Sequence, residues 1–169
     1  MHERLSALVT GPLNELQIAF ICRETLKGLE YLNSKNQIHR DIKAANILVA
    51  ASGRVMLCDF GISALLSSSA SKRNTLIGTP HWMAPEVANG STYDITADIW
   101  SLGIFAYEMA KGSPPHSDLR DYEVVRLIPK AKTPSLPEGD GSLGLREFIA
   151  FCLQAAPSEV RILSCSLAI

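Results

Sequence analysis

Two short apolar segments separated by five residues constrain the fold of this chain more than any other feature. Residues 47–49 and 55–58 are each long enough for a short strand, and Gly53 lies in the connection between them. This pattern predicts a small β-hairpin. Because a hairpin returns the chain to its starting point, the polar residues 39–46 before it and Asp59 after it are expected at the same end.

The segments on either side of the hairpin have the apolar spacing of helices. Asn14 and Gln17 have the spacing of a capping box, so we expect a long helix to begin there and to open the ordered part of the chain. Residues 94–110 are apolar on nearly every side, which predicts a buried central helix. Shorter helices are expected at about 122–127 and 143–153. The predicted fold is therefore mainly α, with one hairpin.

Composition excludes several classes of protein. The chain has 169 residues and a formal net charge of -1, so nothing in its overall charge indicates a nucleic-acid partner. No apolar segment reaches the ~18 residues that suggest a membrane span, and no secretory signal is visible. The four cysteines are scattered without a paired spacing, which favours free thiols in a reducing compartment. These features favour a cytoplasmic location.

Three short motifs follow one another in a set order along the chain. The sequence His-Arg-Asp-Ile-Lys-Ala-Ala-Asn occupies residues 39–46, Asp-Phe-Gly occupies 59–61, and Ala-Pro-Glu occupies 84–86. Together they resemble the signatures of eukaryotic protein kinases. Each motif alone is weak evidence, because Asp-Phe-Gly by itself is more often an ordinary surface turn. The order of all three, linked by a hairpin, favours the kinase interpretation.

The resemblance can be narrowed to one branch of the kinases. Lys43 after the Asp, and Gly-Thr-Pro at 78–80, look like serine/threonine kinases. Residues 72–86 are similar to the activation segment of Ste20-type kinases of the germinal-centre-kinase branch. The resemblance implies the helical C-terminal lobe of a kinase, with a small hairpin and without the N-terminal lobe. It implies transfer of the γ-phosphate of ATP, with Mg²⁺, to serine and threonine hydroxyls of protein substrates.

The chemistry of phosphoryl transfer fits the residue types in these motifs. Asp41 would accept or orient the proton of the substrate hydroxyl, and Lys43 would place positive charge on the transferred group. Asn46 and Asp59 carry the hard oxygen ligands that Mg²⁺ prefers. By resemblance, Leu48 would lie under the adenine ring.

The resemblance also assigns regulatory and structural roles. Thr75 would be phosphorylated by an upstream kinase or by self-phosphorylation, and Arg40 would bind the phosphate. The alternative for Thr75 is a plain polar loop residue. Thr79 would contact Asp41 and Lys43 and help to select the hydroxyl acceptor. Glu86 and Asp98 would be structural, although Asp98 could also be an ordinary acid at a helix start.

Several features depart from the family pattern. No candidate precedes residue 39 for the glycine-rich loop or the strand lysine, so we expect a partial kinase domain at 1–161, with feeble ATP affinity alone, and an atypical tail at 162–169. Arg161 lies one residue out of the register expected of the partner of Glu86. Residues 139–144 fit GxGxxG, but no strand precedes them, which favours a surface loop.

Two alternatives to an enzyme remain open at this point. The chain could be a non-catalytic module that binds partners through its activation segment and the loop at 114–118. Such a module has no chemical need for Asp41, Lys43, Asn46 and Asp59 together. The isolated chain could also fold poorly, because a single lobe exposes apolar surface around Leu48.

Overall fold

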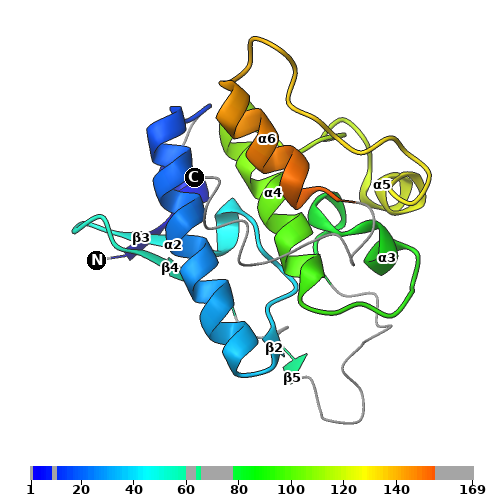
Figure 1. Ribbon diagram of the computed structural model, residues 1–169, viewed down its shortest axis with the longest axis horizontal. Helices are drawn as coiled ribbons and strands as arrows, with labels where there is room; N and C mark the ends of the chain where they lie inside the picture. Colours follow the sequence, from blue (N-terminus) through cyan, green and yellow to red (C-terminus); the bar gives the residue numbers. More distant parts are fainter. Residues whose placement is uncertain (1, 9–10, 60–63, 66–77, 155–169) are drawn as a thin grey trace.

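The structure is a computed structural model that describes residues 2–8, 11–59, 64–65 and 78–154 (Figure 1). The predicted mainly helical fold with one small hairpin is confirmed. The helices are α1 (Leu5–Leu8), α2 (Glu15–Ser34), α3 (Pro85–Ala88), α4 (Thr96–Lys111), α5 (Asp121–Leu127) and α6 (Leu143–Cys152). The strands are β1 (His2–Arg4), β2 (Gln37–Ile38), β3 (Ile47–Ala50), β4 (Val55–Leu57) and β5 (Ala64–Leu65). In the described part, none of the helices combines the length and apolar character that crossing a bilayer requires.

Helix α2 begins where the sequence predicts. The Asn14 side chain accepts a hydrogen bond from the Gln17 backbone N–H at 3.0 Å, and the Gln17 side chain accepts one from the Asn14 N–H at 3.1 Å. This reciprocal pair satisfies N–H groups that the first helical turn leaves without a partner. One face of the helix is buried, and its buried residues include Ile18, Cys22 and Leu26.

The hairpin strands β3 and β4 belong to a three-stranded sheet in the order β1-β3-β4, with β3 in the centre. Antiparallel pairing places Ile47 opposite Leu57 and Val49 opposite Val55. The expectation that a long helix opens the ordered part of the chain is wrong, because β1 pairs with the free edge of β3 and puts Arg4 opposite Leu48. A three-residue strand has no periodicity to detect and depends on a long-range partner.

Helix α4 forms the centre of the core, as its apolar sequence predicts. It packs against both α2 and α6 (Figure 1). Phe105 and Leu102 are fully buried, and two polar residues, Asp98 and Ser101, are buried with them. Gly112 ends the helix in the left-handed conformation, which glycine adopts without a steric penalty.

We expect Gly103→Ala to lower the free energy of unfolding by about 1–3 kcal/mol, because the added methyl group must displace packed atoms. A Cβ at Gly103 would lie 2.7 Å from Cys152 Cβ and 2.8 Å from Leu153 Cδ2. Urea unfolding followed by circular dichroism measures the change. Gly144→Ala is the matched control, because its Cβ would meet only Ser142 Oγ, at 3.7 Å. Equal stability of the two variants would contradict this packing.

Candidate active site

The loop that carries Asp41 is held by a buried carboxylate on α4. Asp98 Oδ2 accepts a hydrogen bond from the His39 backbone N–H, and Asp98 Oδ1 accepts one from the Arg40 N–H, both at 2.8 Å. Burial raises the pKa of the Asp98 carboxyl, against the opposing effect of these two N–H groups. The two bonds fix the backbone on the N-terminal side of Asp41, where Arg40 adopts a φ of 74°.

His39 connects this loop to the end of the hairpin. Its Nε2 lies 3.0 Å from the Cys58 carbonyl oxygen, and its Nδ1 accepts from the Asp41 backbone N–H at 3.3 Å. This arrangement requires the tautomer with the proton on Nε2. The Cys58 N–H in turn donates to the Asn46 carbonyl at 3.0 Å. The two ends of the hairpin are therefore joined, as the sequence predicts.

Three side chains converge on the Asp41 carboxylate. Lys43 Nζ lies 2.9 Å from Asp41 Oδ2, and Asn46 Nδ2 donates to the same oxygen at 2.7 Å. Thr79 Oγ1 donates to Asp41 Oδ1 at 2.5 Å and also accepts a bond from Lys43 Nζ. Thr79 lies 38 residues further along the chain than Asp41, so the fold brings together the loop and the end of the activation segment.

The environment of Asp41 keeps its carboxylate ionised. Burial raises its pKa, but hydrogen bonds from Thr79, Lys43 and Asn46 and the charge of Lys43 outweigh burial, so the pKa lies below its ordinary value. An ionised carboxylate is a hydrogen-bond acceptor only. Asp41 can therefore orient the proton of a hydroxyl group at neutral pH.

Gly78 allows the activation segment to approach this loop. Its φ is 126°, a region that L side chains rarely adopt, and a Cβ there would lie 2.8 Å from the Arg40 carbonyl oxygen. Any side chain at this position would collide with the Arg40 backbone, next to the Asp41 that Thr79 contacts. Steric crowding therefore explains why a glycine stands directly before Thr79 in this structure.

Asn46 and Asp59, the predicted magnesium ligands, lie close enough to contact one cation. Arg4 Nη1 donates to Asn46 Oδ1 at 3.3 Å, and Arg4 Nη2 lies 2.9 Å from Asp59 Oδ2. One amide oxygen and one carboxylate fit Mg²⁺, which keeps several water or phosphate ligands. No cluster of three or more His, Cys, Asp or Glu suited to a metal occurs among the described residues. Sequence reasoning missed Arg4, because its contacts depend on strand β1, which the sequence did not predict.

Glu108 on α4 is a second site residue that sequence reasoning missed. Its Oε2 accepts bonds from the Ala44 backbone N–H at 3.2 Å and from Trp82 Nε1 at 3.0 Å. A single oxygen therefore joins the Asp41 loop to the segment that follows Thr79. Its position inside an apolar helix could have suggested a buried role, since carboxylates are rarely buried without partners.

We expect the stability difference between Glu108→Gln and wild type to depend on pH. Burial raises the pKa of the Glu108 carboxyl, against bonds from Ala44 and Trp82 and the charge of Lys43. The folded state therefore holds this proton more tightly than the unfolded chain, whose value is near 4.5. The contribution of Glu108 to folding is complete below that value and is lost as pH rises through the raised pKa.

Glutamine removes this loss, so its advantage over glutamate should grow with pH. The gain is about 1.4 kcal/mol for each tenfold difference in proton affinity between the folded and unfolded states. Urea unfolding of both proteins from about pH 4 to about pH 7 measures it, in the range where the linkage acts. A difference that stays constant over this range would contradict the assigned direction.

Thr75, the predicted phosphorylation site, lies outside the described residues, but its predicted partner Arg40 is described. Arg40 Nε and Nη2 are buried and have no hydrogen-bond partner among the described residues. The guanidinium carbon lies 5.6 Å from the centre of the Tyr93 ring. Buried guanidinium groups normally have acceptors, so Arg40 has the capacity to bind an added anion.

The remaining predicted residues lie apart from this cluster. Leu48 is partly buried in the middle of the sheet, between Arg4 on β1 and Met56 on β4. Glu86 is half-buried at the start of α3, and burial raises its pKa. Its predicted partner, Arg161, lies outside the described residues. Residues 139–142 precede α6 as an irregular segment, and Ser142 caps that helix.

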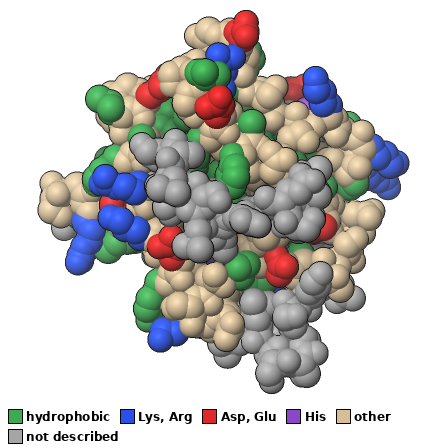
Figure 2. Space-filling model, in the orientation of Figure 1, with side chains coloured by type: hydrophobic (Ala, Val, Ile, Leu, Met, Phe, Trp, Pro, Cys, Tyr) green, Lys and Arg blue, Asp and Glu red, His purple; other side chains and the backbone are tan. Residues whose placement is uncertain are grey.

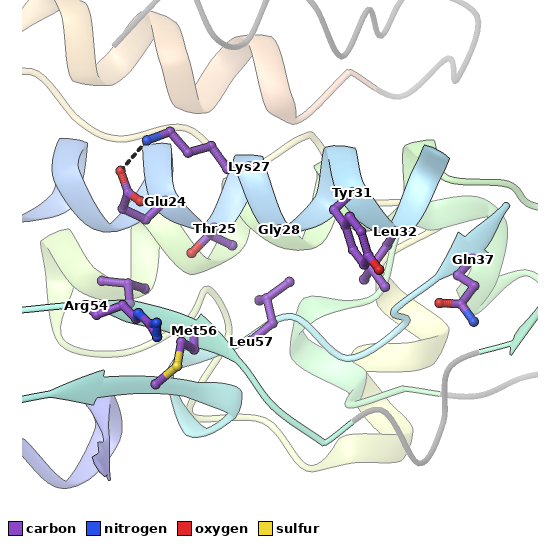
Figure 3. Close-up of a pocket in the computed structure, with 11 residues that line it drawn as sticks. Glu24, Thr25, Lys27, Gly28, Tyr31, Leu32, Gln37, Arg54, Met56 and Leu57 are labelled. Carbon is purple, nitrogen blue, oxygen red and sulfur yellow. Dashed lines mark hydrogen bonds and ion pairs between the residues drawn. The ribbon is translucent and has the colours of Figure 1, made fainter. Parts of the chain in front are cut away.

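A pocket of about 840 Å³ lies elsewhere, between α2 and β4 (Figure 3). Leu57 points from the strand toward the helix, and Gly28 and Tyr31 lie on the helix side. A Cβ at Gly28 would lie 2.8 Å from Leu57 Cδ1, so the two elements are in close contact at this point. None of the predicted site residues lines this pocket, and pocket size does not identify the candidate active site.

Comparisons with known proteins agree with this geometry. The family described as "Protein kinase domain" matches residues 1–162. Serine/threonine-protein kinase dst2 of Dictyostelium discoideum is 54% identical over 153 residues, which cover 88% of this chain and 13% of that protein. Serine/threonine-protein kinase sid1 of Schizosaccharomyces pombe is 50% identical over 152 residues (89% and 32%), and cst-1 of Caenorhabditis elegans is 49% identical over 150 residues (88% and 30%).

These matches confirm the resemblance to Ste20-type serine/threonine kinases. They do not extend over the whole of the matched proteins. The chain spans between 13% and 32% of the length of these three curated relatives.

Proposed function

The chain belongs to the protein kinase family, and from this premise we propose that it forms the substrate-binding and catalytic part of a serine/threonine kinase. The proposed reaction transfers the γ-phosphate of ATP to serine or threonine hydroxyls of protein substrates. The observation that carries the proposal is the convergence of Lys43, Asn46 and Thr79 on the Asp41 carboxylate. A dedicated binding module would have no need for this arrangement.

In the proposed reaction Asp41 orients the acceptor hydroxyl and accepts its proton. Lys43, at 2.9 Å from Asp41, lies where its charge would stabilise the transferred phosphoryl group. The Thr79 hydroxyl bonds to both residues and so holds the acceptor side of the site. Serine/threonine specificity would follow from these contacts of Thr79 with Asp41 and Lys43.

Asn46 and Asp59 would hold Mg²⁺, and Leu48 would support the adenine ring. The bound metal would neutralise charge on the phosphates of the nucleotide. Support for a shared metal site comes from the one guanidinium group that contacts oxygens of both residues. The Asn46 amide also donates to Asp41, so the same residue would link the metal to the base.

The proposed kinase is regulated by phosphorylation of Thr75, by an upstream kinase or by the protein itself. The buried and unsatisfied nitrogens of Arg40 support a phosphate site beside the Asp41 loop. Phosphate at Thr75 would add about 1.5 to 2 negative charges, which Arg40 can bind in a bidentate manner. Glu86 and Asp98 would act as structural anchors.

We propose that residues 1–161 form the kinase portion and that 162–169 form an atypical tail. A cytoplasmic location remains a prediction. The protein substrate is proposed only as a chemical class, a polypeptide with an accessible serine or threonine.

A phosphate-transfer assay tests this function. The sequence offers no candidate for the glycine-rich loop, so the chain is joined to the corresponding lobe of dst2 or sid1. The chimera is given ATP, Mg²⁺ and a generic acceptor protein. We expect phosphoserine and phosphothreonine, without phosphotyrosine. Loss of transfer in Asp59→Asn, with full transfer in the exposed control Asp118→Asn, would support the metal role.

Transfer to tyrosine would contradict the assigned specificity. Equal transfer by Asp59→Asn and the wild-type chimera would contradict the assigned metal ligand.

A further inference from the structure

The side chain of Arg4 occupies the place that the proposed function assigns to a metal ion. Strand β1 pairs Arg4 with Leu48, two residues after Asn46, and this pairing directs the side chain toward the Asp41 loop. Its guanidinium group contacts Asn46 Oδ1, Asp59 Oδ2 and the Ala45 carbonyl oxygen. Lys and Arg side chains gather at the left of Figure 2, over the region of β1, β3 and β4 in Figure 1.

We propose that Arg4 is an intramolecular competitor of the divalent cation, so that metal loading requires β1 to release it. This inference rests on the proposed function, because it takes Asn46 and Asp59 as the metal ligands. It adds an autoinhibitory contact made by the chain's own first strand.

Shared acceptor atoms are the first reason for competition. Mg²⁺ requires its oxygen ligands at about 2.0–2.1 Å in nearly octahedral geometry. Arg4 lies 2.9 Å from Asp59 Oδ2 and 3.3 Å from Asn46 Oδ1. A metal ion bonded to these two oxygens would occupy the space of the guanidinium group.

Charge is the second reason. The Arg4 guanidinium neutralises the Asp59 carboxylate, which it contacts at 2.9 Å. A guanidinium group stays charged over the whole working range of pH, and its charge repels a second cation at contact distance. The competitor cannot be removed by deprotonation and must move away.

Exposure makes the contact reversible. The side chains of Arg4 and Asp59 are 47% and 51% exposed, and all three residues of β1 are exposed. Exposed ion pairs contribute little to stability, so a divalent cation at moderate concentration can displace this one. The Arg4–Asp59 ion pair is therefore weak, although it lies at the proposed metal site.

Binding of Mn²⁺ alone to the full chain tests the proposal. Free Mn²⁺ is counted by electron paramagnetic resonance during a titration. We expect Arg4→Gln to bind Mn²⁺ about three- to tenfold more tightly than wild type, the change expected from removing one exposed ion pair. The matched control is Arg54→Gln, which removes a positive charge before β4 of the same sheet and should leave the affinity unchanged.

A second readout follows Arg4 itself. In a titration of wild type with Mg²⁺, the Arg4 side-chain N–H signal in the nuclear magnetic resonance spectrum should change with the midpoint of metal binding. An Arg4 signal that stays unchanged at saturating metal would overturn the proposal.

Equal Mn²⁺ affinity of Arg4→Gln, Arg54→Gln and wild type would also overturn the Arg4 proposal. If Asp59→Asn binds Mn²⁺ weakly in the same experiment, the assigned metal site is still supported. If Asp59→Asn binds Mn²⁺ as tightly as wild type, the metal binds elsewhere. The assigned metal site then fails, and the Arg4 proposal fails with it.

Discussion

Asp41→Asn in the chimeric kinase should lower the rate of phosphate transfer by about 10²- to 10⁴-fold, the range that positioned acid–base groups contribute. Asparagine keeps the shape of the side chain but removes the negative charge. It also places an amide N–H₂ where the Thr79 hydroxyl or Lys43 now donates to a carboxylate oxygen. The acceptor hydroxyl would then have no partner to receive its proton.

Initial rates with saturating ATP and acceptor protein measure the effect. The nucleotide affinity of Asp41→Asn should stay close to wild type, because Asp41 is proposed to contact the acceptor rather than the nucleotide. Asp118→Asn removes an exposed carboxylate and serves as the control. A rate for Asp41→Asn within about twofold of wild type would be a much smaller change than the expected one. It would remove Asp41 from the mechanism.

Asp98→Ala should lower the free energy of unfolding by about 2–6 kcal/mol, because each of two buried N–H groups left unsatisfied costs about 1–3 kcal/mol. The buried Asp98 carboxylate accepts hydrogen bonds from the backbone N–H groups of both His39 and Arg40, each at 2.8 Å. A loss of this size is a large fraction of the total stability of a typical domain.

Urea unfolding of Asp98→Ala and Asp98→Asn separates the contributions of the two hydrogen bonds that Asp98 accepts. Asparagine restores one acceptor oxygen, but its amide group faces the second N–H, so it should recover only part of the loss. Asp118→Ala gives the baseline for an exposed aspartate. Stability of Asp98→Ala equal to that of Asp118→Ala would show that the loop is held by other contacts.

The sequence was most informative where local patterns decide the structure. The capping box at Asn14 and Gln17 predicts the start of α2, and the apolar character of residues 94–110 predicts the buried helix α4. The hairpin is predictable because its turn and its two strands are adjacent in the sequence. These elements lie within two residues of their expected bounds.

Sequence reasoning failed where a contact depends on distant partners. Strand β1 forms only because β3 offers a free edge more than 40 residues away. The roles of Arg4 and Glu108 follow from such contacts, with Asp59 and Trp82 respectively. No spacing rule links these pairs, so only the folded arrangement reveals them.

Paramagnetic relaxation shows directly whether Asp41, Asn46 and Asp59 converge on one metal–nucleotide site. Mn²⁺ with ATP is added to the isotope-labelled chain, and the broadening of each backbone amide signal is measured. We predict that the signals of these three residues broaden first and together, while that of Phe148 on the buried face of α6 stays sharp. Broadening centred on any other part of the surface, with these three signals unchanged, would contradict the account.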